Sequence, residues 1–229
     1  MTLPSRLLGI IFSPRSTCQA LAQAPRWADV LILSTLAAAM AGVLVMRTEV
    51  GQVALLDQWE RTAEAFGRTV DDAAYARLRQ LSEEGSIYEV GRAVLYGPVQ
   101  ALAVSTLVFL VFGRRRGGAT FRQVLSVVSH ASVILALRQL VGAAATYFRE
   151  TTASATAIGL WFPMFDEASP AARFLSAMDL LVIWWIVVLG IGVATLYRKP
   201  TVRVASAMAG MYAVLALMMT AAMALAGGE

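Results

Sequence analysis

The sequence predicts an all-α membrane protein: a polytopic bundle of five transmembrane helices, with an N-terminal interfacial helix and a helical first outer loop. Composition is the first indication, because 58% of the 229 residues are apolar and 15% are charged, whereas soluble domains have about 45–50% and about 25%. The second is a set of five apolar stretches that fit a hydrocarbon core about 30 Å thick, which takes roughly 20 helical residues. The third is the concentration of basic residues in alternate connections.

Residues 1–27 are predicted to be a cytoplasmic interfacial segment rather than a span. The apolar run from Leu7 to Phe12 is short, Arg6 precedes it, and Pro14 divides the segment. Such a broken, amphipathic pattern is typical of a helix that lies in the plane of the membrane interface. A disordered tail is the alternative.

Cys18 is the only cysteine, so the chain cannot form an internal disulfide. A thiol on the cytoplasmic side fits a reducing compartment. Two interpretations of Cys18 remain open at this point: a reactive thiol, or a small apolar side chain on the interfacial helix, which we favour.

The rest of the chain, residues 28–229, is predicted to be the membrane domain. Gly97-Pro98 is expected to bend the second span near one end, because proline removes a backbone donor. Small residues that let helices approach closely recur in the spans, among them Gly190, Gly192 and the pair Ser206 and Gly210. The five predicted spans are residues 28–46, 93–112, 123–146, 174–196 and 204–226.

The loop over residues 47–92 is the longest polar segment, and its pattern predicts two short amphipathic helices. Apolar residues recur at helical spacing from Glu49 to Gly67. Thr69 to Asp72 resembles a capping box, which predicts a second helix running to about Leu81 and ended by Gly85. These helices pack against each other or on the outer ends of the spans; a partner-binding hairpin is the alternative.

Charge in the connections predicts the orientation of the bundle. Residues 1–27 and the second-to-third and fourth-to-fifth connections contain basic residues and no acidic residue, whereas acidic residues outnumber basic ones in the other two loops. The positive-inside rule then puts the N-terminus in the cytoplasm and, after five spans, Glu229 outside. The net charge of +4 does not indicate nucleic-acid binding, because the arginines flank apolar spans instead of forming one stripe.

Two charged residues inside predicted spans, Arg138 and Asp179, are expected to form an ion pair. A charge at the centre of a span costs roughly 2.5–3.5 kcal/mol on insertion scales, so such residues usually find partners. Arg138 lies in the outer half of the third span, and Asp179 lies about one and a half turns inside the fourth span from its outer end. The alternative is that Arg138 extends alone to the outer headgroups.

His130 is predicted near the middle of the membrane. It precedes Arg138 by eight residues, which corresponds to about 80° around a helix, so the two side chains could line one polar seam. A proton relay would need more such groups. We therefore favour a structural histidine bonded to a neighbouring helix, for example to Gln100, Ser105 or a backbone carbonyl.

We predict no catalytic, cofactor-binding or metal site. One cysteine and one histidine cannot build a closed metal site. The sequence has no Gly-x-Ser-x-Gly motif, no Walker motif and no dinucleotide-binding fingerprint.

Four short motifs lie in order over nearly the whole chain: Phe12-Ser13-Pro14-Arg15-Ser16-Thr17, Pro25-Arg26-Trp27, Gly117-Gly118-Ala119-Thr120-Phe121 and Met178-Asp179-Leu180-Leu181-Val182-Ile183-Trp184. Together they resemble bacterial proteins with a Yip domain. The predicted order of five spans, with the N-terminus inside and the C-terminus outside, also resembles that family.

The resemblance implies a membrane protein of the bacterial cytoplasmic (inner) membrane that has a structural or partner-contact role at Asp179 and Trp184. Eukaryotic members bind prenylated Rab-type GTPases and act in vesicle traffic. This chain lacks their long acidic or proline-rich N-terminal region, which argues against GTPase binding.

Three hypotheses about function follow. We favour a non-enzymatic scaffold or adaptor that binds membrane lipids, other membrane proteins or itself, with Arg114, Arg115 and Arg116 attracting anionic lipid. A small transporter or channel subunit with a polar seam at His130, Arg138 and Asp179 is the second. An intramembrane enzyme is the third, and it lacks a second catalytic group beside either His130 or Asp179.

Overall fold

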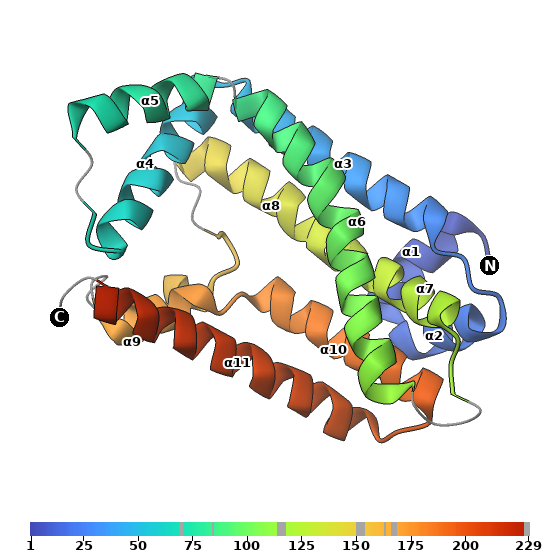
Figure 1. The fold of residues 1–229 in the computed structure, drawn as a ribbon. Coiled ribbons are helices and arrows are strands. Elements are labelled where there is room, and N and C mark those ends of the chain that lie inside the picture. The colour runs from blue at the N-terminus through green and yellow to red at the C-terminus, as the bar shows by residue number, and fades with distance from the viewer. Residues whose placement is uncertain are drawn as a thin grey trace. The chain divides into compact units, whose positions relative to one another are not determined.

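The computed structural model describes residues 1–68, 71–83, 85–113, 118–149, 154–162, 164–165 and 169–226, and the regular structure of these residues is helical (Figure 1). Among them, five helical segments are long and apolar enough to cross a membrane, which confirms the predicted fold class. The helices are α1 (Leu3–Phe12), α2 (Pro14–Gln23), α3 (Ala28–Met46), α4 (Glu49–Ala65), α5 (Asp72–Glu83), α6 (Gly85–Phe112), α7 (Phe121–Ala131), α8 (Val133–Arg149), the 3₁₀-helix η1 (Ile158–Trp161), α9 (Pro170–Ala177), α10 (Leu180–Tyr197) and α11 (Thr201–Ala226).

The bounds of the first, second and fifth spans agree with the sequence, although the helix that contains the second span begins earlier than predicted. The first predicted span coincides with α3, and the fifth lies within α11. The second loop helix, predicted to run to about Leu81 and to end before Gly85, is α5 and ends at Glu83, whereas Gly85 is also the first residue of α6. Residues 86–96 contain no proline, so the helix of the span extends back through them.

Two predicted spans are interrupted rather than continuous, which corrects the sequence-based prediction. The third span consists of α7 and α8, with Ser132 between them, and the Ser132 hydroxyl donates to the carbonyl of Val128 at 2.9 Å. Such back-bonding by serine often bends a helix. The range predicted for the fourth span covers the end of α9, then Met178 and Asp179, then α10, and the helix in this range that is long and apolar enough to cross a membrane is α10. Asp179 therefore lies at a break between two helices, not one and a half turns inside a continuous one.

The chain divides into two compact units, and we describe each separately. The first unit comprises residues 1–38, 93–137 and 181–211. Its core is built around α7, in which every residue from 124 to 131 is buried, together with Val188, Leu189 and Val193 of α10. The helices α1 and α2 pack against each other and against α7 (Figure 1), so the N-terminal segment is part of this unit.

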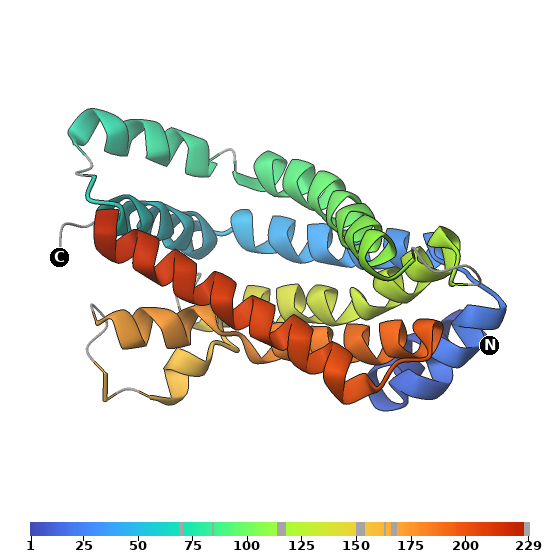
Figure 2. The same cartoon turned by 60° about the horizontal axis from the view of Figure 1, so that its bottom comes forward.

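The second unit comprises residues 39–92, 138–180 and 212–229. Its small core contains Val45, Met46 and Leu55, with Trp59 of α4 and Ala143 of α8 packed against them. The helices α4 and α5 of the loop between the first two spans contact each other, and η1 contacts α9 (Figure 2). Thr48 caps α4, because its hydroxyl accepts a hydrogen bond from the Gly51 amide at 3.1 Å.

Two glycines of the first unit provide a matched test of close packing. A Cβ atom at Gly192 of α10 would collide with the Val127 side chain and lie 3.1 Å from the Cys18 sulfur, whereas a Cβ at Gly210 of α11 meets no atom within 4 Å. We expect Gly192→Ala to lower the free energy of unfolding by about 1–3 kcal/mol, the usual cost of overpacking. Gly210→Ala should be neutral or slightly stabilising, because alanine favours helix.

Thermal unfolding of the two purified variants in detergent measures this difference. A lower midpoint is expected for Gly192→Ala and not for Gly210→Ala. Equal midpoints for both variants and the natural protein would contradict the close approach at Gly192.

Candidate functional site

Polar side chains in the described residues gather in two clusters, one in each unit. We call the first the Arg6 cluster; it consists of Arg6, Asp29 and His130. We call the second the Asp179 cluster, and its members are Arg138, Ser154, Thr156, Asp179 and Tyr212.

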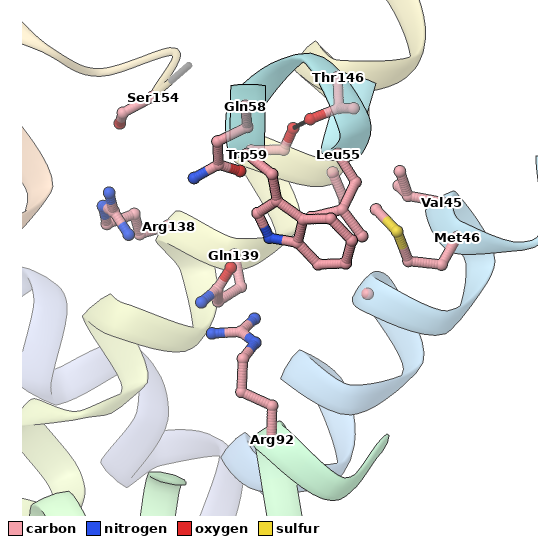
Figure 3. A pocket seen from close by; sticks show the side chains of 13 residues that line it. Val45, Met46, Leu55, Gln58, Trp59, Arg92, Arg138, Gln139, Thr146 and Ser154 are labelled. Atoms are coloured by element: carbon pink, nitrogen blue, oxygen red, sulfur yellow. Dashed lines mark hydrogen bonds between the residues drawn. The ribbon is translucent and has the colours of Figure 1, made fainter. Parts of the chain in front are cut away.

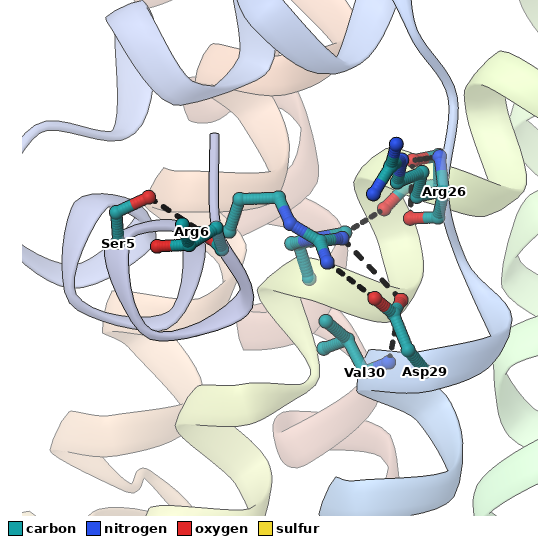
Figure 4. Close-up of polar contacts among 8 residues, drawn as sticks. Ser5, Arg6, Arg26, Asp29 and Val30 are labelled. Atoms are coloured by element: carbon teal, nitrogen blue, oxygen red, sulfur yellow. Dashed lines mark hydrogen bonds and ion pairs between the residues drawn. The ribbon is translucent and has the colours of Figure 1, made fainter.

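The Arg6 cluster joins the N-terminal helix to the first span (Figure 4). Arg6 of α1 is only 3% exposed, and its Nη1 and Nη2 atoms bind the two carboxylate oxygens of Asp29, the first contact at 3.3 Å. Asp29 lies in the first turn of α3, where the helix dipole favours a negative charge, and it also accepts a hydrogen bond from the Val30 amide at 2.9 Å. This bidentate arrangement is the strong geometry for an arginine–carboxylate pair.

His130 completes the Arg6 cluster, and its protonation state follows from its partners. Nε2 lies 3.2 Å from Nη1 of Arg6, and Nδ1 lies 2.7 Å from the carbonyl oxygen of Ser126. A guanidinium can only donate, so Nε2 accepts and Nδ1–H donates to the carbonyl. His130 is therefore a neutral, fully buried imidazole in the structure.

Further contacts fix α2 and the segment after it to α7. The Ser126 hydroxyl accepts a hydrogen bond from the backbone amide of Arg26 at 3.1 Å and donates to its carbonyl at 2.9 Å. Thr120 and Gln123 form a capping box at the start of α7, and Nε2 of Gln123 donates to the carbonyl of Ala22 at 2.6 Å. The N-terminal helices are therefore held in place by polar contacts as well as by apolar packing.

Cys18 of α2 is fully buried in this arrangement, and burial raises the pKa of its thiol to about 12. Because the thiolate is the reactive form, we expect alkylation near pH 8 to be roughly a thousandfold slower in the folded protein than for an ordinary thiol of pKa about 8.5. Maleimide labelling followed by mass spectrometry measures this rate, with the chain unfolded in sodium dodecyl sulfate as the control. Equal rates in both states would contradict the buried position of Cys18.

The Asp179 cluster surrounds a carboxylate at the break between α9 and α10. Oδ2 of Asp179 accepts a hydrogen bond from Nε of Arg138 at 2.7 Å and another from the Ser154 hydroxyl, and Oδ1 accepts one from the Thr156 hydroxyl at 2.9 Å. The ion pair expected between Arg138 and Asp179 is thus present in the structure. The carboxylate side chain is only 4% exposed, whereas that of Arg138 is 34% exposed.

The same cluster satisfies backbone groups that the helix break leaves without helical partners. The Tyr212 hydroxyl donates to the carbonyl of Ala177 at 2.8 Å and accepts from the Asp179 amide at 3.1 Å. On the other side, the Ile158 amide donates to the Met178 carbonyl at 2.8 Å, and the Leu180 amide donates to the Thr156 carbonyl at 2.9 Å. An unsatisfied backbone group in lipid costs several kcal/mol. These hydrogen bonds therefore stabilise the break between α9 and α10.

A pocket of about 310 Å³ lies in the second unit, beside the Asp179 cluster (Figure 3). It is lined by Arg138 and Gln139 of α8, Trp59 of α4, Arg92 of α6 and Ser154.

Among the described residues, no three His, Cys, Asp or Glu side chains lie close enough together to hold a metal ion.

Comparison with known proteins identifies the family. The chain matches the model of the Yip1 domain over residues 8–223. The chain belongs to the Yip1 family. The resemblance derived from the four sequence motifs is therefore confirmed at the level of the family. No match was found among curated proteins or among solved structures.

The motifs that carry the resemblance to the Yip1 family lie where helices begin, end or contact each other. Ser13 and Pro14 form the turn between α1 and α2, and Arg26 bonds Ser126 through its backbone. Thr120 caps α7, and Asp179 occupies the break before α10. In this member of the Yip1 family, the short motifs therefore make the contacts that connect helices.

The residues of this Yip1 domain that the sequence named as site candidates do not form one site in the structure. His130 belongs to the first unit, and Arg138 and Asp179 belong to the second. Trp184 lies on α10 and is 39% exposed. The cluster Arg114, Arg115 and Arg116 lies outside the described residues, as do Gly117 and Glu229.

Sequence reasoning missed several members of the two clusters in this Yip1 domain. From the sequence, Arg6 is only a part of the amphipathic pattern of residues 1–27 and Asp29 carries no site prediction, although an arginine in an apolar segment and an acid at the start of the first span are an available signal. Ser154, Thr156 and Tyr212 gave no signal, because hydroxyl residues are common in loops and at the ends of spans.

Proposed function

We propose that this Yip1-family membrane protein is a non-enzymatic scaffold or adaptor that binds other membrane proteins or lipids. The observation that carries the proposal is that the buried ionisable groups already make hydrogen bonds to other parts of the protein. His130 is held neutral between Arg6 and the Ser126 carbonyl, and the Asp179 carboxylate accepts bonds from three side chains at a helix break. Groups engaged in this way stabilise the fold and are poorly placed to act on a substrate.

The exposed surface of the last span also supports a binding role. Only 11% of the residues in the apolar window of α11 are buried within the protein. Ser206 and Gly210 lie on its exposed side, and a Cβ at Gly210 would meet nothing within 4 Å. Small residues on such a face allow another membrane helix to approach closely, and lipid covers the face otherwise.

The proposal includes an orientation, which rests on charge in the connections. The N-terminus, with residues 1–27 at the interface, lies in the cytoplasm of a bacterial cell, and the C-terminus lies outside the inner membrane. Arg114, Arg115 and Arg116 then face anionic lipid on the cytoplasmic side. The partners are membrane lipids and membrane proteins, including a second copy of the chain, and not a GTPase or a nucleic acid.

Native electrophoresis of gently solubilised membranes tests the scaffold directly. We expect a chain tagged at the N-terminus and expressed at its natural level to migrate in a reproducible assembly heavier than the 24.5 kDa monomer, with partners identified by mass spectrometry. Proteoliposomes that contain the purified protein should show no ion or solute flux above empty vesicles. A lone monomer that conducts such a flux would overturn the scaffold in favour of a transporter.

A further inference from the structure

An exposed apolar segment lies in the connection between the third span and α10. Residues 151–165 contain no charged side chain, and the stretch is shorter than the roughly 20 residues that a crossing takes. We call residues 158–162 and 164–165 the aromatic segment. Within it, Trp161 is 72% exposed and Met164 is 78% exposed. The large apolar side chains that it exposes are those of Leu160, Trp161, Phe162, Met164 and Phe165.

Hydrogen bonds fix the aromatic segment to the start of α10. The Ile158 amide donates to the Met178 carbonyl at 2.8 Å, and the Leu180 amide donates to the carbonyl of Thr156 at 2.9 Å. The 3₁₀-helix η1 also packs closely on α9 (Figure 2), because a Cβ atom at Gly159 would lie only 3.0 Å from a backbone nitrogen of α9. The exposed side chains are therefore held at the level of Leu180.

Helix lengths place this attachment at the edge of the hydrocarbon core. The 18 residues of α10, from Leu180 to Tyr197, extend over about 27 Å at 1.5 Å per residue, which nearly matches a core about 30 Å thick. Arg138 gives the same depth, because it binds Asp179 and lies about 26 Å along the helices from Phe121, where the third span begins. The aromatic segment is therefore at the boundary between acyl chains and headgroups.

Lipid is the occupant that this position and chemistry favour. Tryptophan is enriched at the boundary of the bilayer, because its ring is apolar and its indole N–H can bond to headgroups or water. Neighbouring large apolar side chains are unfavourable on a surface that faces water, and an uncharged segment offers a protein partner no ion pairs. The helix α10, which begins at this point, crosses the same bilayer.

We propose that the aromatic segment is an interfacial anchor, whose exposed side chains insert between lipid headgroups and acyl chains at the start of α10. With the orientation proposed above, this is the outer leaflet. Because the segment is bonded to Met178, the anchor also holds the break between α9 and α10 at the edge of the core, where headgroups and water can reach its polar groups. The inference goes beyond the proposed scaffold and does not depend on it.

Fluorescence quenching in proteoliposomes of the full chain tests the anchor. A nitrobenzoxadiazole label on Met164→Cys reports the depth of the segment, with Leu36→Cys in the middle of α3 as the reference for lipid and Arg61→Cys on α4 as the reference for water. The natural chain is the blank, because its only thiol is buried. The quenchers are iodide on both sides of the vesicle and phosphatidylcholine brominated either near the headgroup or deep in the acyl chains.

We expect the Met164→Cys label to be quenched mainly by the lipid that is brominated near the headgroup. The Leu36→Cys label should respond to the deeply brominated lipid, and the Arg61→Cys label to iodide alone. Stronger quenching of the Met164→Cys label by the deeply brominated lipid than by the shallow one would overturn the boundary position. Quenching by iodide to the extent seen at Arg61→Cys would place the segment in water and overturn the proposal.

A second substitution tests whether the aromatic side chains hold the segment in the lipid. Adding Trp161→Glu to the labelled chain should abolish lipid quenching and shift the label's emission to longer wavelength, because a carboxylate is costly to remove from water. Trp161→Phe keeps an aromatic ring and should retain the lipid quenching. Both changes are at an exposed side chain, so the fold should remain intact.

Two further outcomes would overturn the anchor. Unchanged lipid quenching in Trp161→Glu would show that the exposed aromatic side chain does not hold the segment at the boundary. Protection of the Met164→Cys label from both iodide and brominated lipid would show that protein covers the segment, either a second copy of the chain or another part of the same chain.

Discussion

Arg138→Leu is expected to lower the free energy of unfolding by about 3 kcal/mol. The substitution leaves the Asp179 carboxylate, 4% exposed, without its cation, and breaking a buried pair from one side costs about 3–5 kcal/mol. Ser154 and Thr156 still donate to the carboxylate, which keeps the loss at the lower end of this range. The break between α9 and α10 should weaken with the cluster, because its backbone groups bond to the same residues.

A double-mutant cycle measures this interaction directly. Asp179→Leu in the Arg138→Leu background removes the stranded charge, so the double variant should recover part of the stability that Arg138→Leu loses. Arg47→Leu, an exposed arginine of the same unit, is the control and should change little. Unfolding followed in mixed micelles gives each free energy. Additive losses for the two substitutions would show that Arg138 and Asp179 do not interact.

Asp29→Ala is expected to release the N-terminal helices from α7. The substitution leaves Arg6, which is 3% exposed, as a buried cation without a counter-ion, and this again costs about 3 kcal/mol. The simplest relief is for α1 to leave its site together with α2, which exposes Cys18. A cost of this size corresponds to an increase of about a hundredfold in the labelling rate of Cys18.

Maleimide labelling of the single cysteine reports the release, and a second substitution tests its cause. Arg6→Met in the Asp29→Ala background removes the stranded cation and keeps an apolar side chain, so protection of Cys18 should return. Glu49→Ala, which removes an acid from the first turn of α4, should leave labelling unchanged. Continued protection of Cys18 in Asp29→Ala alone would contradict the role of the Arg6 cluster.

The spans were predictable because a span is a local property of the sequence. Length and hydropathy determine whether a helix can cross the bilayer, and α3 agrees with its predicted bounds at both ends. Family membership was predictable from short motifs that lie in order along the chain. The start of α6 at Gly85 was not predictable. Glycine occurs both just after the end of a helix and at the start of one, and the residues around Gly85 did not distinguish these two positions.

The helix break at Asp179 and the Arg6 cluster depend on partners far along the chain. Apolar residues flank Met178 and Asp179 on the C-terminal side, so the pattern favoured one continuous helix. The break is stabilised by Tyr212, 33 residues away, and by Thr156, 23 residues away. In the sequence, only the charge on Asp179 indicated that a partner was needed. Arg138 was the one other member of the Asp179 cluster that could be identified, because it also carries a charge within a predicted span.

The central claim is that five spans carry the chain across the membrane and leave its ends on opposite sides. Fusing a fluorescent protein that matures only in the cytoplasm, and separately an alkaline phosphatase that is active only outside, to each terminus tests this claim most directly. The account predicts fluorescence from the N-terminal fusion and phosphatase activity from the C-terminal one. Both termini reporting from the same side would require an even number of crossings and would contradict the account.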